Sequence, residues 1–258
     1  MGPDLEAALR ARRDGGGRAF VPYVTGGLPG VDAALLRGLE AAGADAVEVG
    51  IPFSDPVMDG RVIQEASRVA LEAGARPAGV LSTVAEAKLG IPTVTMTYYN
   101  PVLRHGEDRF LDEAAAAGVS GAIVPDLPVD EAEGWIARCA ESGVAPVFLA
   151  APGSALGRLR AIAAGARGFV YCVSTYGVTG ERAELAGTAE EVVAALRPLT
   201  DTPLLVGVGI GRPAQAAEVC RFADGVIVGS AIVRRLLEGD RRGALELAEA
   251  FRAAVPTG

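Results

Sequence analysis

The segment AAGADAVEVG, residues 41–50, contains the pattern on which the whole chain is built. A helix-forming stretch ends at Gly43, and a short apolar strand containing Val47 and Val49 follows it closely. Glycine readily takes the left-handed backbone conformation that ends a helix. The same order of helix end, glycine and strand recurs in AAGVSGAIVP (116–125), ESGVAPVFLA (141–150) and AAGARGFVYC (163–172). Repetition of this unit predicts one continuous α/β architecture.

Eight short strands, rich in Val, Ile and Phe and mostly apolar on both faces, are predicted along the chain. Such strands are typical of a parallel sheet that is covered by helices. They lie at residues 19–25, 46–51, 93–98, 121–125, 145–150, 168–173, 204–208 and 225–228. Between them lie stretches rich in Ala, Leu, Glu and Arg whose residue spacing is that of helices, as in residues 31–42, 108–117, 131–141 and 189–196. We therefore predict one domain, residues 1–258, folded as a single (β/α)8 TIM barrel with a short N-terminal helix.

A Rossmann fold is the main alternative for alternating strands and helices. It requires the spacing G-x-G-x-x-G after the first strand, followed by an acidic residue about 20 positions later. The first strand here ends in TGGLPG, residues 25–30, which lacks that spacing. The sequence therefore favours the closed barrel, in which active residues lie at the carboxyl ends of the strands.

Composition excludes several classes of protein. Half of the 258 residues are hydrophobic, and the formal net charge is −8. An acidic chain without a basic block is a poor ligand for nucleic acid or anionic membranes, and no apolar run is long enough to span a bilayer. The three cysteines are far apart, and the N-terminus lacks the apolar stretch of a signal peptide, which together predict a reducing compartment, the cytoplasm.

Two single residues restrict the chemistry further. His105 is the only histidine, so we expect no metal site of the kind that needs several imidazole ligands. Lys88 is the only lysine, and it precedes the third strand, whereas a Schiff-base aldolase needs its lysine at a strand carboxyl end. Proton transfer by carboxylates remains the most plausible chemistry.

Glu48 is the strongest candidate for a catalytic residue. It lies within the apolar second strand, where it shares a face with Ala46 and Gly50, while Val47 and Val49 occupy the other face. This small-residue face leaves space inside the barrel for a carboxyl group. Burial raises the pKa of a carboxyl group, and groups with shifted pKa values concentrate at functional sites. The alternative is a structural ion pair between Glu48 and an arginine.

Asp59 belongs to the loop PFSDPVMDGRVIQ that follows the second strand, at residues 52–64. The loop is long enough to fold over the barrel opening and bring Asp59 near Glu48. Two carboxyl groups in different surroundings form a plausible acid–base and orienting pair. An aspartate in a loop can equally serve the turn itself, and this alternative is stronger for Asp55, which precedes Pro56.

Three glycine-rich turns follow the last three strands and predict a phosphate site. In many barrels, backbone N–H groups of these loops and a short extra helix bind phosphate. The turns contain Thr179 and Gly180 after the sixth strand, Gly209 after the seventh, and Gly229 and Ser230 after the eighth. Three aromatic residues, Phe20, Tyr98 and Tyr171, lie in or at the end of predicted strands, where they line a pocket or fill the core.

In order along residues 20–237, the motifs resemble those of one known family. VEVGIPFSDPVMDGRVIQ, MTYYNP, VPDLPVDE, GVTG, VGVGI and DGVIVGSAIV are similar to segments of tryptophan synthase alpha subunits. The resemblance implies a TIM barrel that cleaves indole-3-glycerol phosphate to indole and glyceraldehyde 3-phosphate without a cofactor or metal of its own. It also implies a partner, a pyridoxal-phosphate-containing beta subunit, in an alpha2beta2 complex.

The resemblance also implies roles for individual residues. Glu48 matches the general acid–base of the family, and Asp59 matches the carboxylate that binds the indole N–H. Phe20 would form a wall of the indole pocket, and Tyr171 would pack near Glu48. Gly180, Gly209, Gly229 and Ser230 match the phosphate site, and Thr179 and Tyr98 remain substrate-binding candidates from their places after predicted strands.

At two positions this chain departs from the family pattern. Arg61 replaces the proline that usually follows the Asp-Gly of the second-strand motif, and Tyr176 is bulkier than usual before GVTG. Both positions bear on coupling to a partner more than on catalysis. A stand-alone lyase that releases free indole, and a subunit that only activates its partner, are therefore kept as alternatives.

Overall fold

The computed structural model describes residues 2–173, 182–207 and 209–258, and it contains the predicted barrel. Eight parallel strands pair in sequence order, and β1 pairs with β8 to close the ring. Their bounds are β1 Ala19–Thr25, β2 Val47–Gly50, β3 Thr93–Met96, β4 Val119–Ile123, β5 Ala145–Ala150, β6 Val170–Val173, β7 Leu204–Gly207 and β8 Gly225–Val228. The predicted fold class is therefore confirmed.

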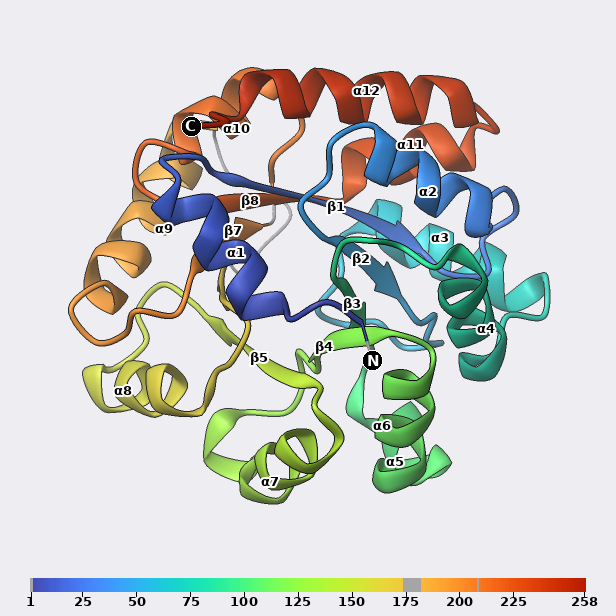
Figure 1. The fold of residues 1–258 in the computed structure, drawn as a ribbon, viewed down its shortest axis with the longest axis horizontal. Coiled ribbons are helices and arrows are strands. Elements are labelled where there is room, and N and C mark those ends of the chain that lie inside the picture. Colours follow the sequence, from blue (N-terminus) through green and yellow to red (C-terminus); the bar gives the residue numbers. More distant parts are fainter. Residues whose placement is uncertain (1, 174–181, 208) are drawn as a thin grey trace.

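Helices surround the strands, and one helix, α1, lies across an end of the ring (Figure 1). The helices are α1 Leu5–Asp14, α2 Ala33–Ala41, α3 Arg61–Glu72, α4 Pro77–Ala87, α5 Tyr99–His105, α6 Glu107–Ala116, α7 Glu133–Ser142, α8 Leu156–Gly165, α9 Arg182–Leu196, α10 Pro213–Val219, α11 Ser230–Leu237 and α12 Arg241–Ala254, with a 3-10 turn at Val129–Glu131. None of the helices in the described part of the chain is long and apolar enough to cross a membrane.

Strand β4 differs most from its predicted bounds. It begins at Val119 and ends at Ile123, two residues before the predicted segment at each end. The reason is local: Gly118, with φ 92°, completes the turn after α6, so the extended backbone begins at the next residue. The helix–glycine–strand pattern itself is confirmed at this position.

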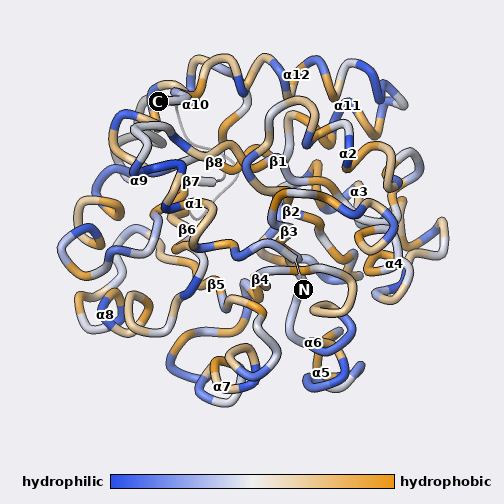
Figure 2. Tube along the Cα trace, viewed as in Figure 1, coloured by the Kyte–Doolittle hydropathy of each residue, from blue (hydrophilic) through white to orange (hydrophobic). Residues whose placement is uncertain are grey.

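Apolar side chains form two separate layers. The larger layer lies between strands and helices, and it contains outward-facing residues such as Val47 and Val49. The smaller layer fills the barrel and includes Val21, Val94 and Phe169. Along α12, hydrophobic and hydrophilic residues alternate, as a helix with one face on the barrel requires (Figure 2).

The N-terminal helix α1 closes the amino-terminal end of the barrel. Its Leu5 and Leu9 belong to the inner apolar layer rather than to the outer one. A methyl group added at Gly121 or Gly168 would lie 2.6 or 2.5 Å from a Leu5 methyl carbon, so both glycines leave room for this side chain. Glu6 accepts a hydrogen bond from Gly168 N at 2.9 Å, which fixes the helix to the barrel rim.

Candidate active site

Glu48 points into the barrel, as the alternation of strand β2 predicts. It is paired in register with Tyr23 of β1 and with Val94 of β3, whose side chain belongs to the inner layer. The side chains of Val47 and Val49 lie in the outer layer with the helices. Only 1% of Glu48 is exposed. The strand thus places one carboxyl group among apolar barrel residues.

The surroundings of Glu48 favour the protonated carboxyl group. Its Oε2 atom has no hydrogen-bond partner among the described residues, and none of the ion pairs found within these residues includes Glu48. Burial, and secondarily the charge of Asp59, raises the pKa of Glu48 to about 8. Glu48 therefore carries a proton at neutral pH. The alternative of a structural arginine pair finds no support in the described part of the chain.

Asp59 is brought to the same opening by the loop after β2. Its carboxylate accepts a hydrogen bond from the hydroxyl of Tyr98, and that hydroxyl accepts one from Met58 N at 2.9 Å. The ring of Tyr98 stacks on Phe53, with centroids 5.2 Å apart, and Gln64 donates to the carbonyl of Asp59 at 2.9 Å. These contacts connect the loop around Asp59 to the residues that follow β3 and to α3. Tyr98 is thus a partner of Asp59, a role that strand patterns alone do not predict.

The two carboxyl groups differ in protonation because their surroundings differ. Burial raises the pKa of Asp59 to about 6, while the hydrogen bond from Tyr98 acts in the opposite direction. At neutral pH, Asp59 is mostly ionised and Glu48 is mostly protonated. An acid and an anion at one opening can donate a proton and stabilise a cation in the same reaction.

Tyr171 lies inside the barrel beside Phe169, as predicted for two residues on one face of the sixth predicted strand, residues 168–173. The two ring centroids are 6.3 Å apart. The hydroxyl of Tyr171 lies over β7, where a methyl group added at Gly207 would approach it to 2.0 Å. Burial, followed by the charge of Glu48, raises the pKa of Tyr171 well above its ordinary value. Tyr171 therefore remains a neutral hydroxyl near the acid.

The structure does not place Phe20 at the barrel opening. Its ring stacks on Phe251 of α12, with centroids 6.2 Å apart, in the layer between strands and helices. Alternation along β1 explains this, because Val21 belongs to the inner layer and Tyr23 is paired with Glu48, whereas Phe20 lies on the opposite face of the strand. Tyr23, which is paired in register with Glu48, is the aromatic residue of β1 on the face of the carboxyl group. Because side chains alternate between the two faces of a strand, the sequence alone could have placed Tyr23 on the same face as Val21.

The described part of the predicted phosphate site lies after β7 and β8. Gly229 precedes α11, no side chain caps this helix, and Ser230 at its first position is exposed. In the loop after β7, the backbone of Gly209 has φ 83°, a conformation that favours glycine. The first N–H groups of a helix lack partners within the helix and attract anions. Thr179 and Gly180, like Tyr176, lie outside the described residues.

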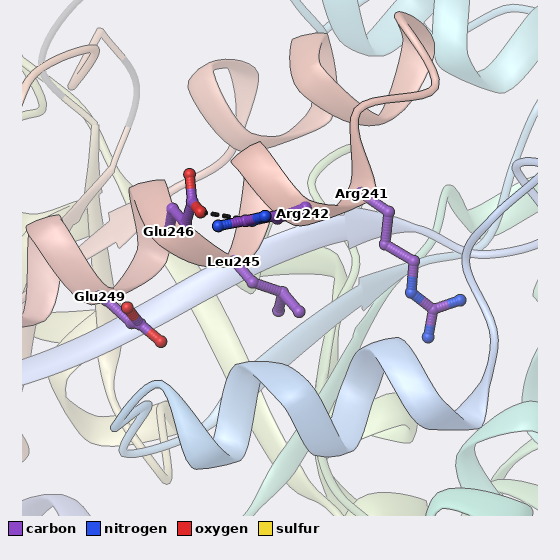
Figure 3. Close-up of a pocket in the computed structure, with 5 residues that line it drawn as sticks. All are labelled: Arg241, Arg242, Leu245, Glu246 and Glu249. Atoms are coloured by element: carbon purple, nitrogen blue, oxygen red, sulfur yellow. Dashed lines mark hydrogen bonds and ion pairs between the residues drawn. The ribbon is translucent and has the colours of Figure 1, made fainter.

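A separate surface hollow of about 570 Å³ lies on α12 (Figure 3). It is lined by Arg241, Arg242, Leu245, Glu246 and Glu249. Leu245 packs against α2, since a methyl group added at Gly38 would lie 2.9 Å from it. None of the predicted site residues lines this hollow, which lies on the helical layer outside the barrel.

Within the described residues, no group of three or more His, Cys, Asp or Glu side chains could hold a metal ion.

Comparison with known proteins gives consistent results. The model of the family described as "Tryptophan synthase alpha chain" matches residues 9–254. A tryptophan synthase alpha chain from Streptomyces coelicolor is 47% identical, covering 98% of this chain and 96% of that protein. One from Synechocystis is 44% identical, covering 98% of both.

Solved structures are similar over the whole length. Tryptophan synthase from Mycobacterium tuberculosis contains a chain with a TM-score of 0.92 and 40% identity, with 100% of each chain covered. Tryptophan synthase subunit alpha from Legionella pneumophila has a TM-score of 0.89 and 31% identity, with 97% of each chain covered.

Proposed function

This chain belongs to the tryptophan synthase alpha chain family, and we propose that Glu48 and Asp59 carry out its reaction. The reaction is the cleavage of indole-3-glycerol phosphate to indole and glyceraldehyde 3-phosphate, a step of tryptophan biosynthesis. One observation supports these roles above the others: a buried and a partly buried carboxyl group at one opening have pKa values raised to about 8 and about 6.

In this proposal, Glu48 is first a general acid. Its carboxyl group donates a proton to the indole ring carbon that carries the glycerol chain. That carbon then has four single bonds, and the ring nitrogen becomes positively charged. A carboxyl group with a pKa of about 8 is suited to this step because it is protonated at neutral pH.

Asp59 stabilises the cation that this protonation creates. Its carboxylate accepts a hydrogen bond from the indole N–H, and the bond strengthens as positive charge develops on the nitrogen. The hydroxyl of Tyr98 and the loop contacts hold the carboxylate in place beforehand. Such preorganisation reduces the rearrangement needed during the reaction.

The carbon–carbon bond then breaks, and Glu48 acts as a base. Its carboxylate removes the proton from the hydroxyl next to the ring, which becomes the aldehyde oxygen of the product. The bonding electron pair returns to the indole ring and neutralises the nitrogen. Glu48 recovers its proton, and indole and glyceraldehyde 3-phosphate leave. In this sequence no step requires a cofactor in this chain.

The substrate phosphate would be bound by backbone N–H groups of the last βα loops. The uncapped start of α11 and the adjacent Ser230 support this location. The reacting end of the substrate would then lie toward β2, near Glu48 and Asp59.

We also place the protein in the cytoplasm, because its cysteines, Cys139, Cys172 and Cys220, are all free thiols.

Proteins of this family form complexes with a beta subunit, which would hold the pyridoxal phosphate. Exposed apolar side chains support docking at the carboxyl ends of the strands. Val57 and Met58, in the loop after β2, are 80% and 47% exposed, and Leu103 and Leu156 follow β3 and β5. Exposed apolar surface that lies in one region often marks a protein interface. The cation Arg61 begins α3 at the same end of the barrel.

The test is indole release from indole-3-glycerol phosphate by the wild type and by Glu48→Gln, with and without a beta subunit. We expect the variant to lose about 10²–10⁴-fold in kcat in both conditions. Glu65→Gln is the matched control, because Glu65 is exposed on α3 and pairs with Arg68 there.

Each alternative gives a distinct result. A stand-alone lyase would release indole at full rate without the beta subunit. A subunit that only activates its partner would release none, yet would still raise the activity of the beta subunit. Near wild-type cleavage by Glu48→Gln would show that another group supplies the proton.

A further inference from the structure

Tyr23 connects the two ends of the proposed site. The near end of its ring lies beside the start of α11, because a methyl group added at Gly229 would be 3.4 Å from its Cδ1 atom. Its hydroxyl lies over β2, because a methyl group added at Gly50 would be 2.1 Å from the oxygen. The side chain therefore extends from the proposed phosphate end to the strand that carries Glu48. This arrangement depends on β1 lying between β8 and β2.

The Tyr23 hydroxyl can form more hydrogen bonds than it forms with the described residues. A phenol can donate one hydrogen bond and also accept. Its one hydrogen bond among the described residues is to Thr25 Oγ1 at 3.4 Å, which is long for a bond between two hydroxyls. Yet Tyr23 is only 6% exposed, so bulk water satisfies little of this need. A buried hydroxyl without a good partner is costly, and a ligand hydroxyl would relieve that cost.

The Tyr23 hydroxyl also keeps its proton at neutral pH. Burial, followed by the charge of Asp59 and more weakly that of Glu48, raises the pKa of Tyr23 well above its ordinary value. It can therefore act as a hydrogen-bond donor or acceptor but not as a base. This makes it suitable for binding a neutral hydroxyl group and unsuitable for a proton-transfer step.

We propose that Tyr23 is a substrate-binding residue whose hydroxyl recognises the hydroxyl on the middle carbon of the glycerol chain. This inference rests on the proposed function. The phosphate is at one end of the three-carbon chain and the breaking bond is at the other. Only the middle hydroxyl lies between these ends, and the side chain of Tyr23 spans the same interval, from Gly229 at its ring base to β2 at its hydroxyl. The middle hydroxyl does not react, so its contact with Tyr23 persists through the cleavage and determines specificity.

The test compares two substrates on two proteins. One substrate is indole-3-glycerol phosphate, and the other lacks the middle hydroxyl but keeps the hydroxyl next to the ring, so it can still be cleaved. The kcat/KM ratio of the two is measured for the wild type and for Tyr23→Phe. A neutral hydrogen bond corresponds to a factor of about three to ten. We therefore expect the preference of the wild type for the complete substrate to fall by that factor in Tyr23→Phe.

Folding defects cannot imitate this result, because both substrates are measured on the same preparation and the active fraction cancels in the ratio. Tyr99→Phe is the control variant, since it removes a hydroxyl that bonds to Glu107 on α6 outside the barrel. Its substrate preference should equal that of the wild type. Tyr23→Leu, which also removes the ring beside Gly229, should reduce the affinity for both substrates.

The result separates this inference from the proposed function. Wild-type protein that cleaves neither substrate would contradict the function itself. Wild-type protein that cleaves the complete substrate, with the same preference in Tyr23→Phe as in the wild type, would overturn the role of Tyr23 alone. A preference that falls equally in Tyr99→Phe would also overturn it.

Discussion

Glu48 and Asp59 differ chemically because their surroundings differ. Glu48 projects from a strand into an apolar barrel, and its Oε2 atom has no hydrogen-bond partner among the described residues. Asp59 lies on a loop and accepts a hydrogen bond from Tyr98, which favours its ionised form. One residue is therefore prepared to donate a proton, and the other is prepared to stabilise a cation.

The first prediction at this scale is the pH dependence of kcat/KM. Activity requires ionised Asp59 and protonated Glu48, so it should fall as pH drops below about 6 and as pH rises above about 8. Because the two carboxyl groups interact, these apparent pKa values describe the pair. A steady-state profile from pH 4.5 to 9.5 measures both limbs.

Asp59→Asn gives the second prediction. It should reduce kcat strongly and change KM little, because the contact strengthens in the transition state. The acidic limb should disappear, and the basic limb should move to lower pH, since the charge that raises the pKa of Glu48 is gone. Asp55→Asn, in the same loop, is the control. A change confined to KM would contradict the role of Asp59.

At the scale of elements, α1 and α11 have different roles at opposite ends of the barrel. The helix α1 inserts Leu5 and Leu9 into the inner apolar layer, whereas α11 presents its uncapped start. The first arrangement stabilises the fold, and the second provides N–H groups for an anion. Each can be changed without altering the carboxyl pair.

Leu5→Ala tests the contribution of α1. Leu5 is 2% exposed, and its removal should reduce the free energy of unfolding by about 2–5 kcal/mol. The kcat of the folded protein should stay unchanged, because the active site lies at the other end of the strands. Leu103→Ala is the control, since that leucine is 59% exposed. Denaturant titration of both variants measures the difference, and equal losses would contradict the prediction.

Ser230→Asp tests the start of α11 as an anion site. A carboxylate there is favourable for the helix, so stability should not fall. It should nevertheless repel a phosphate and weaken the binding of glycerol 3-phosphate by about tenfold or more. Isothermal titration calorimetry measures this, with Ser82→Asp on the exposed side of α4 as the control. Unchanged affinity in Ser230→Asp would place the phosphate elsewhere.

At the scale of the whole molecule, the catalytic acid reduces the stability of the fold. Glu48 has a pKa of about 8 when folded and an ordinary value near 4.5 when unfolded. Between these pH values the folded state holds a proton that the unfolded state has released. The free energy of unfolding therefore falls as pH rises through this range, and it is constant with respect to this group above pH 8.

Glu48→Gln should remove this dependence. Relative to the wild type, the variant should gain stability as pH rises from 5 to 8, by an amount on the order of 4 kcal/mol. Chemical denaturation at several pH values measures the difference, and Glu65→Gln provides a surface control. Parallel curves for Glu48→Gln and the wild type would show that Glu48 does not have a raised pKa.

Much of this molecule follows from local sequence. The order of eight strands, the glycines that end the helices, and the inward direction of Glu48 all depend on neighbouring residues. Backbone geometry alternates every two residues in a strand, and glycine takes the turn conformations that other residues avoid. Strand alternation and the turn conformations of glycine do not depend on distant parts of the chain. The barrel and the inward position of Glu48 could therefore be predicted from the sequence.

Only the tertiary structure decided which groups meet. Sequence motifs assigned the pocket wall to Phe20, but packing against Phe251 of α12 places that ring outside the barrel. Tyr98 reaches Asp59 because the loop after β2 folds over β3. Tyr23 spans from Gly229 to Gly50 because β1 closes the ring between β8 and β2. These contacts join residues far apart in the chain, and their geometry and pKa shifts exist only once the barrel has closed.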